Sequence, residues 1–194
     1  MRTTFVSWTV GLAAAVLLSG PALAAPTGLG VGVHGGYGQS ADAESGSPLA
    51  GAHVLLNVAP WLGVVGSVEF KFKEDHVESG IDYDVTSYPI NLLGRIYLPM
   101  GSLNPYVTGG MQYKVIRYGG NLFEDFELDD GENSFGWVAG VGASLSPAGS
   151  IELFGEVLYE SNDPERDLGS AVEDAKDFRY DQWSARAGIT LILN

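Results

Sequence analysis

Residues 90–117, INLLGRIYLPMGSLNPYVTGGMQYKVIR, contain two alternating segments on either side of a short join. In 90–98 every second residue is apolar or glycine, and Arg95 belongs to the opposite set. The same period of two recurs in 107–115, with Lys114 in the opposite set. This pattern predicts a β-hairpin. In a soluble sandwich its apolar face would pack on a second sheet, whereas in a membrane barrel it would contact lipid and leave both cations in a polar lumen.

The N-terminal segment has the features of a secretory signal peptide. Arg2 supplies a positive charge, and VGLAAAVLL at 10–18 is an apolar core too short to cross a bilayer as a helix. Ala22-Leu23-Ala24 fits the small-residue cleavage pattern. We therefore predict that residues 1–24 are removed before Ala25, leaving 25–194 as the mature domain.

Composition narrows the class of protein. The chain has no cysteine, which excludes a small domain held by disulfides. Glycine is roughly twice as frequent as usual, yet a hydrophobic content of 45% is too high for a disordered linker. Glycine within alternating segments suits a tightly curved small barrel. The formal net charge of −14 excludes generic nucleic-acid binding, which needs a basic surface.

Alternating segments and loop lengths together predict the architecture. The segments are 27–39, 48–58, 62–73, 82–98, 105–118, 135–145, 151–159 and 179–193. Their connections alternate between short joins and long polar stretches, the latter at 40–47, 74–84, 119–133 and 161–177. Short turns at one rim and long loops at the other are typical of outer-membrane barrels. We predict an all-β, eight-stranded antiparallel up-and-down transmembrane β-barrel.

Aromatic residues lie near the ends of these segments, where two interfacial girdles would be expected. By the short joins they are Trp61, Tyr97 and Tyr106. By the long stretches they are Tyr37, Phe72, Tyr88, Tyr118, Phe135, Trp137, Tyr159, Phe178 and Trp183. The alternative interpretation is a set of ordinary core aromatics in a soluble β-protein.

Three stretches carry a resemblance to a known family. They are LNPYVTGGMQY at 103–113, IELFGEVLYE at 151–160 and WSARAGITLIL at 183–193. In their order and spacing the chain resembles the outer-membrane β-barrel domain family, which includes OmpA-type and opacity-type proteins. The resemblance implies an eight-stranded up-and-down barrel with a polar interior. We expect a monomer in the outer membrane, in contact with membrane lipid and lipopolysaccharide. It implies no particular activity, and the ending Leu193-Asn194 departs from the terminal aromatic of many members.

Charged residues fall on the inward positions of the predicted strands. They are Glu69, Lys71, Arg95, Lys114, Glu152, Glu156, Glu160 and Arg186, joined by Lys73 and by His34 and His53. The three glutamates of 152–160 also fit a helix face, but β-branched and aromatic neighbours favour a strand. An unpaired buried charge costs several kcal/mol, so we predict an ion-paired plug. The alternative is a gate or narrow ion path, although so small a barrel has no room for a wide channel.

The sequence offers little support for catalysis or a cofactor. His34 and His53 can meet on adjacent strands, but they lack the spacing of a metal-binding motif. No G-x-S-x-G elbow is present. A lipid-modifying enzyme of this fold would need a serine, histidine and acid set at its outer rim. The chain offers only His76, Glu78 and Ser79 there, close together in sequence, so we expect neither an enzyme nor a bound cofactor or metal.

The long polar stretches are strongly acidic. One contains Glu124, Asp125, Glu127, Asp129, Asp130 and Glu132. They would form either a solvated surface or a loose site for Ca²⁺ or Mg²⁺ that bridges to lipopolysaccharide. The expected function is a structural or surface-interaction role through these loops. The alternatives are a narrow channel for ions or small solutes, a lipid-modifying enzyme and a soluble lipocalin-like carrier.

Overall fold

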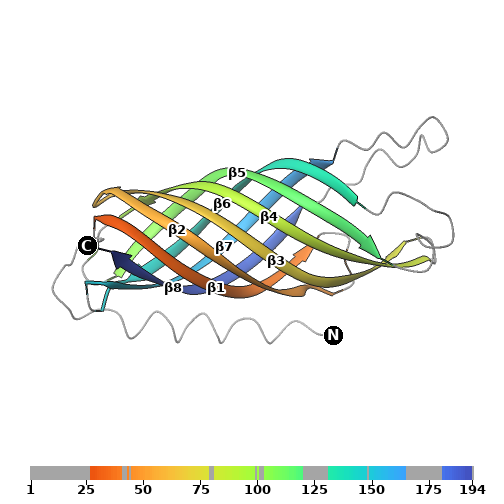
Figure 1. Cartoon of the computed structure of the whole chain (residues 1–194), viewed down its shortest axis with the longest axis horizontal. Coiled ribbons are helices and arrows are strands. Elements are labelled where there is room, and N and C mark those ends of the chain that lie inside the picture. Colours follow the sequence, from red (N-terminus) through yellow and green to blue (C-terminus); the bar gives the residue numbers. More distant parts are fainter. Residues whose placement is uncertain are drawn as a thin grey trace, which may run out of the picture.

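The computed structural model describes residues 27–40, 43, 45–78, 81–98, 100, 103–119, 131–147, 149–164 and 181–193. Within them, eight antiparallel strands close into a barrel in sequence order, with β1 paired to β8 (Figure 1). The strands are β1 (Gly28–Ser40), β2 (Ser47–Ala59), β3 (Leu62–Glu78), β4 (Ile81–Tyr97), β5 (Leu103–Gly119), β6 (Gly131–Leu145), β7 (Ile151–Pro164) and β8 (Gln182–Leu193). The predicted eight-stranded up-and-down barrel is confirmed. No helix in these ranges is long and apolar enough to cross a membrane.

The two faces of the sheet are the reverse of those in a water-soluble protein. On the β4–β5 hairpin, Leu92 and Met111 are 59% and 60% exposed, whereas Arg95 and Lys114 are 1% and 3% exposed. The apolar set therefore faces outward and the charged set faces the interior, as the period of two predicts. This is the arrangement of a barrel whose outer solvent is lipid.

The hairpin formed by β3 and β4 is longer than the sequence indicates. Residues 74–84, predicted as a polar loop, are mostly paired backbone, with Glu74 opposite Val85 and Glu78 opposite Ile81. The hairpin extends well past the ends of β1 and β2 (Figure 1). A strand that extends outside the membrane needs no apolar outer face. The polar composition of this segment therefore led to the wrong prediction of a loop.

A β-bulge in the same hairpin changes which charges face inward. The register between β3 and β4 shifts between Lys71 and Glu74. Because a bulge inserts an unpaired residue, the alternation of faces shifts beyond it. Lys73, predicted to face inward, is exposed, and Glu74 is buried instead.

Two aromatic residues assigned to the girdles lie inside the barrel. Tyr97 and Tyr106 are 1% and 2% exposed, and their rings pack against each other with centroids 5.4 Å apart. Tyr97 shares the inward face of β4 with Arg95. Its orientation is therefore set by the alternation along the strand and not by its position near the rim. Other predicted girdle residues face outward, among them Trp61, Tyr37, Phe72, Phe135, Trp137 and Trp183. The Phe178 residue and the Tyr118 side chain lie outside the described structure.

The tight curvature of the barrel makes glycine necessary at some inward positions. A Cβ added at Gly110 would meet the carbonyl of Leu92 on β4 and lie 2.9 Å from the Cα of Leu93. At Gly66, on the lipid-facing side of β3, a Cβ would have nothing within 4 Å. We expect Gly110→Ala to lower the free energy of unfolding by about 1–3 kcal/mol and Gly66→Ala to leave it nearly unchanged. Urea unfolding in lipid vesicles measures both, and equal effects would contradict this packing.

Candidate functional site in the barrel lumen

Of the nine charged residues predicted to face inward, all except Lys73 lie inside the barrel, where each is at most 6% exposed. They form two groups at different levels. The loop-side cluster consists of Glu69, Lys71, Lys114, Glu160 and Arg186, towards the ends of the strands joined by the long connections. The turn-side cluster consists of Arg95, Glu152 and Glu156, towards the short turns.

Glu160 of β7 is the centre of the loop-side cluster. Its Oε2 atom lies 2.7 Å from Lys71 Nζ and 3.5 Å from Lys114 Nζ. Its Oε1 atom lies 3.3 Å from Arg186 Nη2, and Arg186 also pairs with Glu69. One carboxylate therefore holds three cations contributed by β3, β5 and β8, and this ties distant strands together across the lumen.

Neutral side chains that were not predicted as site residues complete this cluster. Gln112 Nε2 and Ser184 Oγ each donate to Glu160 at 3.1 Å. Asn91 donates from Nδ2 to Glu69 at 2.7 Å, and its Oδ1 atom accepts a hydrogen bond from Gln112 Nε2. All of them occupy inward positions of the same alternating pattern. A polar residue at an inward position would have identified them from the sequence. The prediction considered charged residues only and therefore left them out.

Arg95 organises the turn-side cluster. Its Nη2 atom lies 3.0 Å from Glu156 Oε2, which also accepts a hydrogen bond of 3.0 Å from the Tyr106 hydroxyl. The guanidinium stacks 4.6 Å from the ring centre of Tyr106 and 4.9 Å from that of Phe154. Glu152 is more distant, at 3.9 Å from Arg95 Nη1. Arg95 is thus enclosed by one close carboxylate and two aromatic faces.

Apolar side chains lie between the two clusters on two of the strands. On β7, Leu158 lies between Glu156 and Glu160, and on β4, Leu93 lies between Asn91 and Arg95. These two leucines belong to one buried apolar cluster with Leu55, Val65, Val138 and Ile192.

The histidines occupy the same middle level on the β1–β2 side. His34 Nδ1 and His53 Nδ1 are 3.3 Å apart, and His53 Nε2 is 2.9 Å from Thr190 Oγ1. The His53 ring meets Phe154 edge to face, with centroids 5.3 Å apart. Their expected proximity is confirmed. Among the residues the structure describes, no group of three or more histidines and carboxylates is placed to hold a metal ion.

Several predicted positions lie outside the described structure. They include the leader 1–24, acidic residues 124–130 and Ser79. Glu132 lies in β6, opposite Ile116, and His76 lies in β3, but the side chains of both are also outside it. Cation binding by the acidic stretch therefore stays a prediction.

The sequence matches the family model described as "Outer membrane protein beta-barrel domain" over residues 10–190. The chain belongs to the outer membrane β-barrel family. Membership implies an outer-membrane location, and it agrees with the outward apolar face and the polar lumen. No curated protein matches the chain.

Solved structures show the same fold at low sequence identity. Neisserial surface protein A is similar with a TM-score of 0.64 and 11% identity, covering 86% of this chain and 98% of that one. A major outer membrane protein of Thermus thermophilus gives 0.57 and 15%, covering 85% and 99%. A de novo designed transmembrane β-barrel gives 0.50 and 14%, covering 87% and 97%. Because a designed protein shares it, the fold by itself assigns no function to this family member.

Proposed function

We propose that this protein is a closed outer-membrane barrel, not an enzyme, whose role is structural or lies in surface interaction through its acidic loops. The filled lumen is the observation that supports a closed barrel. Four cations and four carboxylates are buried there in two clusters, together with a cluster of apolar side chains and a histidine pair. Buried charges arranged in this way hold the strands together and leave little space for a solute.

Charge and shape support the surface role. The chain has 24 acidic residues against 10 basic ones, and many of the acidic residues fall in the stretches that join the strands at one rim. The β3–β4 hairpin adds a polar projection at that same rim. We propose that the acidic stretches meet lipopolysaccharide through bridging Ca²⁺ or Mg²⁺. The sheet closes on itself through the pairing of β1 with β8, which supports a monomer.

Conductance in planar lipid bilayers tests whether the barrel is closed. After export with cleavage before Ala25, the purified mature barrel is expected to insert without raising the current above background. A porin inserted in the same bilayer serves as the positive control. Discrete conductance steps from the purified barrel would contradict the proposal and favour the narrow channel instead.

A further inference from the structure

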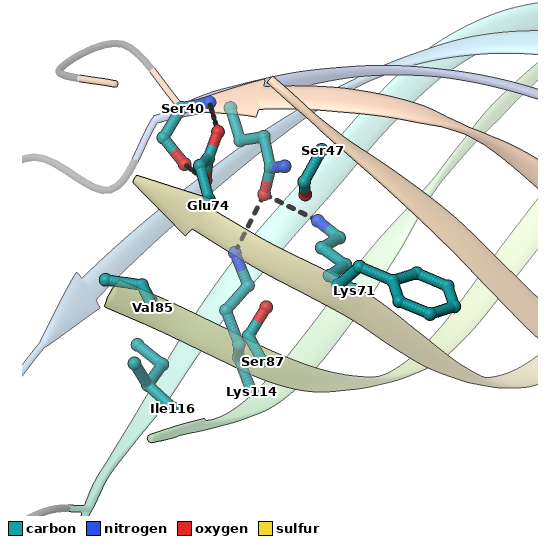
Figure 2. A pocket seen from close by; sticks show the side chains of 10 residues that line it. Ser40, Ser47, Lys71, Glu74, Val85, Ser87, Lys114 and Ile116 are labelled. Atoms are coloured by element: carbon teal, nitrogen blue, oxygen red, sulfur yellow. Dashed lines mark hydrogen bonds between the residues drawn. The ribbon is translucent and has the colours of Figure 1, made fainter. Parts of the chain in front are cut away.

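A small pocket lies at the loop-side end of the lumen, beside Lys71 and Lys114 (Figure 2). Its polar lining comes from β1 to β5 and β8 and includes Ser47, Lys71, Glu74, Ser87, Lys114 and Gln182. In Figure 2 the ammonium groups of Lys71 and Lys114 approach a single amide oxygen, Gln182 Oε1, from two sides. Two buried cations thus share one neutral acceptor at the floor of a pocket.

Hydrogen-bond donors outnumber acceptors at this floor. An ammonium group carries three donors, but the recorded partners of Lys114 Nζ, Glu160 and Gln182, both lie at the long distance of 3.5 Å. Gln182 is 3% exposed, and its Nε2 atom has no hydrogen-bond partner within the described residues. Buried donors without an acceptor are unfavourable, so this floor favours a ligand that accepts hydrogen bonds.

The nearby acceptors are already engaged. The two oxygens of Glu160 receive contacts from three cations and two neutral donors. Glu74, on the opposite wall, accepts hydrogen bonds from the Ser40 amide at 3.0 Å and from its hydroxyl at 2.8 Å. The loop-side cluster itself contains three cations against two carboxylates, which leaves it one positive charge in excess.

We propose that this pocket binds a small oxyanion, such as phosphate or a carboxylate ion. Lys114 Nζ and Gln182 Nε2 donate to it from the floor, and the hydroxyls of Ser47 and Ser87 line its sides. Glu74 opposes the ligand through its charge, which keeps the affinity modest. The site does not depend on what the acidic loops bind.

Nuclear magnetic resonance of the mature barrel in nonionic maltoside micelles, titrated with inorganic phosphate, tests this site. We expect saturable shifts of the Ser47 and Ser87 amides and of the Gln182 side-chain amide, with chloride at equal ionic strength as the control. Lys114→Met should weaken phosphate binding about tenfold or more, because a charge-assisted hydrogen bond is lost. Glu74→Gln should strengthen binding, because it removes the opposing charge and retains an acceptor for Ser40.

The two variants are expected to change affinity in opposite directions, which a general loss of folding cannot produce. A second arm uses nanodiscs containing phosphatidylglycerol in phosphate-free buffer. If the same signals shift there but do not shift with inorganic phosphate, the occupant is a lipid headgroup rather than a free ion. The site is ruled out if neither source gives a saturable shift, if chloride gives the same shifts, or if Lys114→Met binds phosphate as the wild type does.

Discussion

Replacing Glu160 with glutamine is expected to lower the free energy of unfolding by about 3–5 kcal/mol, the range for breaking a buried ion pair from one side. Glutamine keeps the shape of the side chain and one acceptor, but it removes the charge that Lys71, Lys114 and Arg186 share. Three buried cations would then face Glu69 as the one remaining carboxylate of the loop-side cluster. Urea unfolding in lipid vesicles, followed by tryptophan fluorescence, measures the loss.

Glu152 provides a matched control on the same strand. Like Glu160 it is fully buried, but its nearest recorded cation is 3.9 Å away, and neither of its oxygens accepts a hydrogen bond within the described residues. A poorly compensated buried charge contributes little or destabilises the fold. Glu152→Gln is therefore expected to leave stability unchanged or to raise it. Equal losses of unfolding free energy in the two variants would show that the different ion-pair partners of these carboxylates do not affect stability.

Replacing Arg95 with methionine is expected to have an effect of similar size, a loss of about 3–5 kcal/mol. Methionine retains the aliphatic part of the side chain but leaves Glu156 without its cation. It also removes the stacking of the guanidinium on Tyr106 and Phe154, which is worth about 0.5–2 kcal/mol for a desolvated pair. The same unfolding measurement applies.

A double variant tests whether the lost charge explains that effect. Arg95→Met combined with Glu156→Gln removes both partners, so the uncompensated carboxylate disappears. The double variant is expected to be more stable than Arg95→Met alone, and a double-mutant cycle then gives a favourable coupling energy for the pair. If the two losses simply add, the ion pair contributes nothing and stacking accounts for the role of Arg95.

The order of strands and the faces of most residues were predictable because lipid as the outer solvent enforces a period of two. Arg95 and Lys114 show this most clearly, since each alternates with apolar residues along its strand and each points inward. The exceptions are local. The bulge at 71–74 depends on backbone pairing rather than on side-chain polarity, and Tyr97 follows the alternation of its strand although it lies near a rim.

The pairing of charges across the lumen was not predictable. Glu160 and Lys71 lie 89 positions apart, on strands that are not neighbours in the barrel. Which charges meet depends on strand tilt and register summed around the closed sheet, and a single sequence does not specify that sum. The position of the Gln182 amide between Lys71 and Lys114 was unpredictable for the same reason.

The central claim is that lipid is the solvent of the outward face, and tryptophan quenching tests it most directly. The predicted mature chain has three tryptophans, Trp61, Trp137 and Trp183, and each is more than half exposed on the outer surface. For the barrel reconstituted in vesicles, a lipid-facing surface predicts strong quenching by brominated phospholipids and weak quenching by aqueous iodide. Strong quenching by iodide with none by brominated lipid would contradict it.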